Sequence, residues 1–143
     1  MAIYGVGTYY DKTYMGQDFV DNEVVCIGYD PSDAPPNHQL LKNMKIGDIV
    51  FLKGYSPQYG LYIYAVGIVS DEHYRLVNNH LGWGRSVLYT WQDHDDGCIV
   101  IGKSNDRFDY ARRGSIYEEI SPAICKQIVE CVRINGMTIP PSD

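Results

Sequence analysis

The sequence predicts an α+β fold: a curved, mostly antiparallel sheet or small β-barrel with short helices and a C-terminal helix. Three observations support this prediction. Segments with strand character outnumber segments with helical periodicity. The strand segments follow one another closely, as they do in hairpins. The last helical segment has an apolar stripe that a sheet could cover.

The length and composition indicate one domain that spans residues 1–143. A chain of 143 residues can bury a core of its own without a metal or a disulfide. Its residues are 45% hydrophobic and 21% charged, which is ordinary for a globular protein. No internal repeat or linker divides the sequence, so we expect a single core.

The first third of the chain predicts two strands and a short helix. Residues 3–10 and 24–29 are rich in β-forming side chains. Residues 30–36 contain three prolines, which predict an extended or turning loop. Apolar residues then recur at helical spacing over residues 37–45, and this helix should end before Gly47.

The middle of the chain predicts a hairpin and a further strand. A tight turn at residues 45–48, with Gly47 supplying the conformational freedom, leads into a strand over residues 49–53. Residues 61–69 form its partner. Residues 86–91 then predict a strand with three aromatic or apolar side chains on one face: Val87, Tyr89 and Trp91.

The last third predicts one strand and the terminal helix. Residues 98–101 have strand character. Ser121 is suited to cap a helix whose first residue is Pro122. The apolar stripe of that helix consists of Ile124, Ile128, Cys131 and Val132.

Charge and cysteine content restrict the partners. The net charge of −6 disfavours a broad surface for nucleic-acid duplexes, because such binding depends on cations. No leader or membrane-spanning pattern is evident, so we expect a cytoplasmic protein with no membrane partner. The cysteines lack metal-ligand spacing, and we expect no metal and no cofactor. We interpret all four as buried free thiols: Cys26, Cys98, Cys125 and Cys131.

Aromatic residues provide the strongest indication of a binding site. The chain has thirteen tyrosines and two tryptophans but three phenylalanines. Tyrosine combines a stacking face with a polar tip, which suits pockets, although half-buried strands also select it. Tyr9 and Tyr10 end the first predicted strand and Tyr29 begins the proline loop, while Trp83 and Trp91 flank the strand at residues 86–91.

Two segments resemble EVE domains and their PUA-like relatives, which include YTH and ASCH domains. Residues 45–51 (KIGDIVF) match the family's turn and strand, and residues 65–69 (AVGIV) match its return strand. Residues 3–10 occupy the place of the family's first pocket-lining strand. Residues 112–120, which lead into the last helix, resemble small phage- or prophage-borne proteins of this fold.

The resemblance implies a PUA-like fold with an aromatic pocket that reads a modified base. Such a base would belong to a free nucleotide, or to a nucleic acid in which it is single-stranded or flipped out of a duplex. The pocket candidates are Thr8, Tyr9, Tyr29, Trp83 and Trp91. A basic rim is expected from Arg107, Arg112 and Arg113. We expect Arg112 and Arg113 to be exposed to solvent.

Three functions remain open from the sequence. The leading one is a binding module for a modified base or nucleotide, possessing no catalytic residues, in phage defence or counter-defence. The second is a protein-interaction module that sequesters a partner protein, which the acidic balance and the tyrosines would suit. The third is a small nucleic-acid-processing enzyme that uses Asp93, His94 and Asp96.

Overall fold

The structure, a computed structural model, describes residues 1–93, 99–103 and 106–135 and has the α+β class that the sequence predicts. Its elements are β1 (Ile3–Gly7), β2 (Tyr9–Tyr10), β3 (Thr13–Tyr14), α1 (Gly16–Asp21), β4 (Val24–Ile27), α2 (Pro35–Asn43), β5 (Ile49–Ser56), β6 (Gly60–Val69), β7 (Arg75–Asn78), β8 (Gly82–Gln92), β9 (Ile99–Gly102), the 3₁₀ helix η1 (Ala111–Arg113), β10 (Ile116–Glu118) and α3 (Pro122–Asn135).

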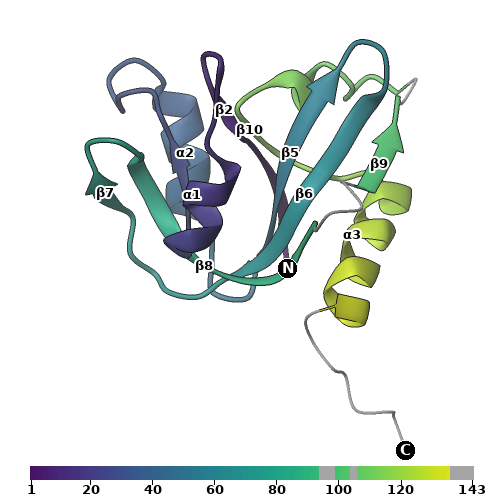
Figure 1. Cartoon of the computed structure of the whole chain (residues 1–143). Helices are drawn as coiled ribbons and strands as arrows, with labels where there is room; N and C mark the ends of the chain where they lie inside the picture. Colours follow the sequence, from purple (N-terminus) through teal and green to yellow (C-terminus); the bar gives the residue numbers. More distant parts are fainter. Residues whose placement is uncertain (94–98, 104–105, 136–143) are drawn as a thin grey trace, which may run out of the picture.

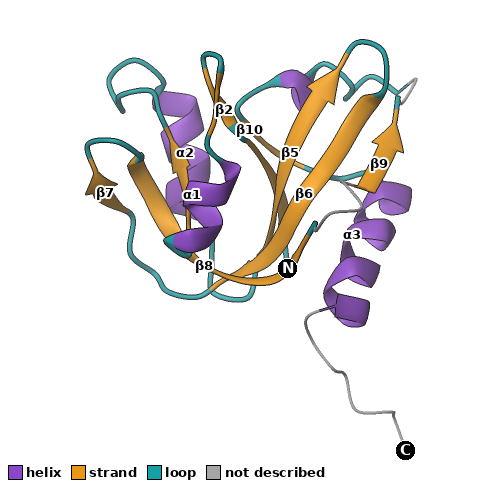
Figure 2. Cartoon of the chain, in the orientation of Figure 1, coloured by secondary structure: helices purple, strands orange, loops and turns teal. Residues whose placement is uncertain are grey.

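The main sheet is mixed and curls into a half-barrel (Figures 1 and 2). Its strand order is β10-β1-β5-β6-β8-β4, with β7 paired to β8 and β9 paired to β6. Only β1 and β5 pair in parallel among the described strands. The chain between them, which holds α1, β4 and α2, is the long crossover that a parallel pair requires. The predicted curved, mostly antiparallel sheet is therefore confirmed as a half-barrel.

The predicted hairpin is confirmed and is longer than expected. Strands β5 and β6 pair in antiparallel fashion from Ile49 opposite Ile68 to Ser56 opposite Gly60. The preceding turn is also confirmed. Gly47 has a φ of +91°, a value that side chains rarely allow.

The carboxylate of Asp48 joins that turn to the start of the chain. Its Oδ2 accepts a hydrogen bond from the Lys45 amide at 2.9 Å, and its Oδ1 accepts one from the Ala2 amide at 3.0 Å. Asp48 is buried, and the amide of Ile49 donates to the carbonyl of Ala2 at 3.0 Å. These bonds fix where β1 meets β5 and so set the parallel register.

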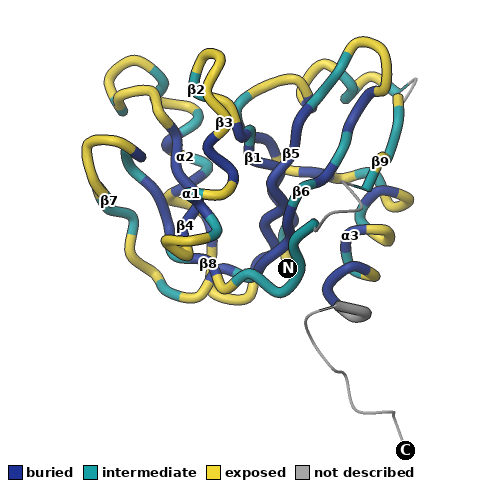
Figure 3. Tube along the Cα trace, viewed as in Figure 1, coloured by how far each residue is buried: buried dark blue, intermediate teal, exposed yellow. Residues whose placement is uncertain are grey.

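The two faces of the sheet carry separate hydrophobic clusters. Figure 3 shows that β1, β4, β5 and β6 are mostly buried. One cluster includes Phe19 of α1 and Leu41 of α2. The other packs α3 against β5 and β6. The predicted stripe of α3 is confirmed, since all four of its members are buried in this second cluster: Ile124, Ile128, Cys131 and Val132.

The boundaries of α2 differ from the sequence prediction. The helix begins at Pro35 rather than residue 37, because prolines fit the first helical turn, where no amide partner is needed. It ends at Asn43, and the buried Arg85 guanidinium donates to the carbonyls of Leu41 (2.8 Å) and Met44 (2.6 Å). A side chain of β8 thus caps α2 and holds it against the sheet.

The prediction that Trp91 shares a face with Val87 and Tyr89 is wrong. Gly67 pairs with Tyr89 but Val66 pairs with Trp91, so Thr90 is an extra residue in the ladder. A bulge of this kind shifts the two-residue alternation of a strand. Tyr89 therefore packs on the cluster of α1 and α2, whereas Trp91 packs on the cluster of α3.

Several short elements were not predicted, namely β3, α1, β7, η1 and β10. Each is too short for hydrophobic periodicity to identify it. No helix within the described residues is long and apolar enough to cross a membrane. The free-thiol prediction is confirmed for the described cysteines, although Cys125 is half-buried; Cys98 lies outside the described residues.

Replacing Asp48 should weaken the fold measurably. In Asp48→Asn, one acceptor oxygen becomes an amide group, so one of the two backbone amides loses its partner. We expect the free energy of unfolding to fall by about 1–3 kcal/mol, measured by urea denaturation. The control Asp33→Asn makes the same change at an exposed loop position and should stay within about 0.5 kcal/mol of wild type. Equal stabilities would contradict the anchoring role.

Candidate functional site

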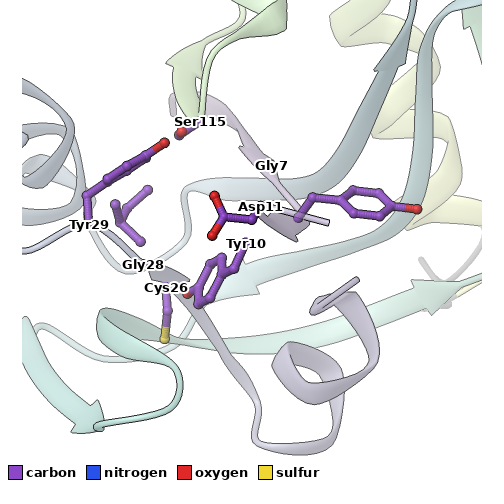
Figure 4. A pocket seen from close by; sticks show the side chains of 9 residues that line it. Gly7, Tyr10, Asp11, Cys26, Gly28, Tyr29 and Ser115 are labelled. Atoms are coloured by element: carbon purple, nitrogen blue, oxygen red, sulfur yellow. The ribbon is translucent and has the colours of Figure 1, made fainter. Parts of the chain in front are cut away.

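A pocket of about 250 Å³ lies beside the end of β1 (Figure 4). It is lined by nine residues from three parts of the chain: Gly7, Tyr9, Tyr10, Asp11, Cys26, Ile27, Gly28, Tyr29 and Ser115.

The pocket forms where the two ends of the curled sheet approach each other. Cys26 and Ile27 belong to β4, the last strand in the order, and Ser115 directly precedes β10, the first strand in the order. The amide of Gly7 donates to the carbonyl of Ser115 at 2.8 Å, which holds the β10 side in place. The pocket is thus a consequence of the incomplete barrel.

Tyr10 forms a fixed wall. Its hydroxyl donates a hydrogen bond to the carbonyl of Leu81, and its ring packs edge-on against Phe19 with the ring centres 6.0 Å apart. Burial raises the pKa of the Tyr10 hydroxyl well above its usual range. The ring also covers Gly28, where an added Cβ would lie 3.1 Å from ring atoms. A side chain at position 28 would therefore disturb this wall.

Tyr29 lies at the mouth of the pocket, with 59% of its surface exposed. Its carbonyl accepts a hydrogen bond from Nε2 of the buried His38 at 2.7 Å. Nδ1 of that ring accepts one from the Tyr74 hydroxyl at 2.7 Å. Because the Tyr29 carbonyl can only accept, this pair of bonds selects the Nε2–H tautomer of His38. The backbone of Tyr29 is fixed while its ring remains available.

The structure brings two of the predicted pocket residues, Tyr9 and Tyr29, to this pocket. Thr8 directly precedes Tyr9 in the chain but is buried, and its hydroxyl donates to the carbonyl of Lys53 at 3.0 Å. Trp83 stacks on Tyr74 with ring centres 5.1 Å apart and does not line the pocket.

Trp91 also lies away from the pocket. It packs on the cluster that covers α3, the opposite face from the cluster that contains Cys26 and Ile27. The sequence expectation that both tryptophans meet the opening strand and the proline loop at one mouth is therefore wrong. The bulge in β8 is the physical reason that Trp91 lies on the other face of the sheet.

The expected basic rim is not assembled at this pocket. The prediction that Arg112 is exposed is wrong, because only 1% of its surface is accessible. Its guanidinium donates to both carboxylate oxygens of Glu119, at 2.8 and 2.9 Å, and to Asp106 at 2.7 Å. Two carboxylates thus neutralise it inside the fold.

The other two predicted arginines, Arg107 and Arg113, each place the guanidinium group over a neighbouring aromatic ring. Arg113 lies over the ring of Tyr55 at 4.9 Å and forms an ion pair with Asp109 at 3.2 Å. Arg107 lies over the ring of Phe108, also at 4.9 Å. Neither arginine lines the pocket.

Seven of the nine lining residues were not among the predicted site residues: Gly7, Tyr10, Asp11, Cys26, Ile27, Gly28 and Ser115. Tyr10 and Asp11 directly follow the predicted Tyr9, and the β2–β3 hairpin that presents them is too short to predict from periodicity. Ser115 lies more than a hundred residues further along the chain. Only the pairing of β10 with β1 places it here.

The catalytic alternatives gain little from the geometry. Of the proposed trio, His94 and Asp96 lie outside the described residues and Asp93 within them. Within the described parts of the chain, no group of three His, Cys, Asp or Glu side chains could hold a metal ion. Burial raises the pKa of the Cys26 thiol to about 12, so this pocket cysteine stays protonated at neutral pH and is a poor nucleophile.

No protein-family model and no curated protein matches this sequence.

Lys53 lies behind the pocket and is buried, with 3% of its surface exposed. It is opposite Gly7 in the β1–β5 pair, and its ammonium group donates to the carbonyl of Gly114 beneath the ring of Tyr117. Burial lowers the pKa of Lys53 from 10.5 to about 8. Among the described residues, no carboxylate forms an ion pair with Lys53.

The buried amine should make stability depend on pH. Between pH 8 and 10.5 the unfolded state binds more protons at Lys53 than the folded state does, so this residue's contribution to the unfolding free energy rises with pH. The shift corresponds to about 3 kcal/mol over that window. Urea denaturation of wild type and Lys53→Met at pH 7 to 10 should therefore show the difference moving in favour of wild type.

The comparison with Lys53→Met is needed because other groups act in the opposite direction. The raised pKa of Cys26 removes stability as pH rises above about 9, and this occurs in both proteins. A wild-type-minus-variant difference that stays constant across this range would refute the assignment to Lys53.

Proposed function

We propose that this chain is a PUA-like binding module whose pocket holds the base of a modified nucleoside, nucleotide or single-stranded or flipped-out nucleic acid. The observation that carries the proposal is the pocket between Tyr10 and Tyr29 at the end of β1. The proposal places recognition there, with Tyr9 at the edge.

The size of the pocket suits a single ring system. Its volume of about 250 Å³ is just below the roughly 300–1,000 Å³ of sites for drug-sized ligands. Tyrosine faces are the usual platform for a base removed from a stack. The wall made by Tyr10 is already fixed before any ligand enters, so little ordering is needed on that side.

The lining favours recognition of the base over recognition of phosphate. None of the nine lining residues is basic, and the arginines of residues 107–113 are engaged elsewhere. A phosphate bound in this pocket would lack the cations that it normally contacts. The sugar and phosphate of a nucleotide would therefore stay outside.

The resemblance to EVE domains supports the same proposal. The residues that carry the resemblance form the turn at residues 45–48 and strands of the β5–β6 hairpin, and the end of β1 contributes to the pocket. The half-barrel sheet is compatible with a PUA-like fold. In this proposal the incomplete closure of the barrel provides the opening through which the base enters.

Truncating the aromatic mouth should weaken binding without unfolding the protein. Tyr29→Ala removes a ring that is 59% exposed, so the core is little affected. Loss of a stacking platform costs about 1–3 kcal/mol, which corresponds to five- to over a hundredfold weaker binding. Calorimetric titration with methylated and unmethylated nucleosides, their monophosphates and six-nucleotide single strands measures this effect.

Tyr59→Ala is the matched control. Tyr59 has the same 59% exposure but lies at the tip of the β5–β6 hairpin, away from the pocket. The Tyr59→Ala variant should bind the same ligands with the affinity of wild type. Equal weakening by both variants would place binding elsewhere. If folded wild-type protein binds nothing in the panel, the proposal fails and a protein partner becomes the leading function.

A further inference from the structure

Asp11 is the single charged residue among those that line the pocket. Figure 4 shows its carboxylate between Tyr29 and Tyr10, directed into the open space. The hydrogen bonds and ion pairs found among the described residues leave this carboxylate without a partner. The pocket therefore contains an acceptor group that the fold itself does not use.

The position of Asp11 is set by the backbone. Tyr10 pairs with Thr13, so Asp11 and Lys12 form the two-residue turn between β2 and β3. Asp11 has a φ of +53°, in the left-handed region that aspartate and asparagine tolerate better than most residues. The hydrogen bond of Tyr10 to Leu81 anchors the strand directly before it. The carboxylate is thus presented from a defined turn.

An ionised carboxylate only accepts hydrogen bonds, and it attracts positive charge. The tyrosine rings around it also attract cations through their faces. A ligand ring that carries a fixed positive charge satisfies both kinds of group at once. A neutral ring satisfies them less well, and an anionic group is repelled.

We propose that Asp11 makes the pocket selective for a cationic nucleobase, such as a purine or pyrimidine that methylation of a ring nitrogen has left positively charged. This inference rests on the proposed function and specifies its ligand class. Asp11 is the specificity-determining residue, and Tyr10 and Tyr29 provide the stacking faces.

The test compares two nucleosides that differ by one methyl group and one charge. At neutral pH 1-methyladenosine is cationic, whereas adenosine is neutral. Calorimetric titration of wild type should show about tenfold tighter binding of 1-methyladenosine, the effect of one charge-assisted contact in a partly exposed site. The ratio should decrease as salt is raised from 20 to 500 mM.

The variant Asp11→Asn tests the carboxylate directly. Asparagine retains the shape of the side chain and tolerates the positive φ, so the variant removes the charge and exchanges one acceptor oxygen for an NH2 group at an unchanged backbone. The affinity ratio should fall to about one. Asp33→Asn removes one negative charge from the exposed proline loop and should keep the wild-type ratio.

The outcomes separate this inference from the function beneath it. A wild-type ratio near one, or an Asp11→Asn ratio equal to that of wild type, would overturn the role of Asp11 while leaving base binding intact. If the Asp11→Asn variant does not fold, the affinity ratio of the wild-type protein by itself decides whether the pocket is selective for a cationic base. Failure of wild type to bind any base in the wider panel would overturn the proposed function and this inference with it.

Discussion

The buried carboxylate of Asp48 fixes the first residues of the chain beside β5 and thereby determines where the pocket lies. By accepting hydrogen bonds from the amides of Ala2 and Lys45, it aligns the first residues with the strand that follows α2. Strand β1 then pairs in parallel with β5, and β10 adds to its other side. A shift of β1 by one residue would turn its buried side chains to the opposite face, so this register decides the whole arrangement.

The half-barrel leaves the two ends of its sheet close together, and the space between them is the pocket. One wall is rigid because Tyr10 is held by Leu81, Phe19 and Gly28. The mouth has a fixed backbone and an exposed ring at Tyr29. A carboxylate at Asp11 gives the space a negative character. This combination fits a flat ring with positive charge better than a phosphate.

The sequence predicted the parts of the fold that depend on local patterns. The turn at Gly47, the β5–β6 hairpin and the buried stripe of α3 all follow from spacing and backbone preference. The prediction failed where long-range contacts decide. A bulge in β8 moved Trp91 to the other face.

The candidate site could be predicted only in part for the same reason. Arg112 is buried because it forms ion pairs with Glu119 and Asp106, although its sequence neighbourhood is that of an exposed basic segment. Tyr9 and Tyr29 were identified from their positions beside a strand and a loop. Ser115 joins them through the pairing of β10 with β1, which no local pattern in the sequence reveals.

The central claim is that residues from both ends of the sheet form one binding site. Two-dimensional ¹H–¹⁵N NMR during titration with 1-methyladenosine tests it most directly. The account predicts that the amide signals of Gly7, Gly28 and Ser115 shift together, with the same apparent affinity, while that of Tyr59 remains unchanged. Shifts confined to one end of the sheet, or centred on the β5–β6 hairpin tip, would contradict the account.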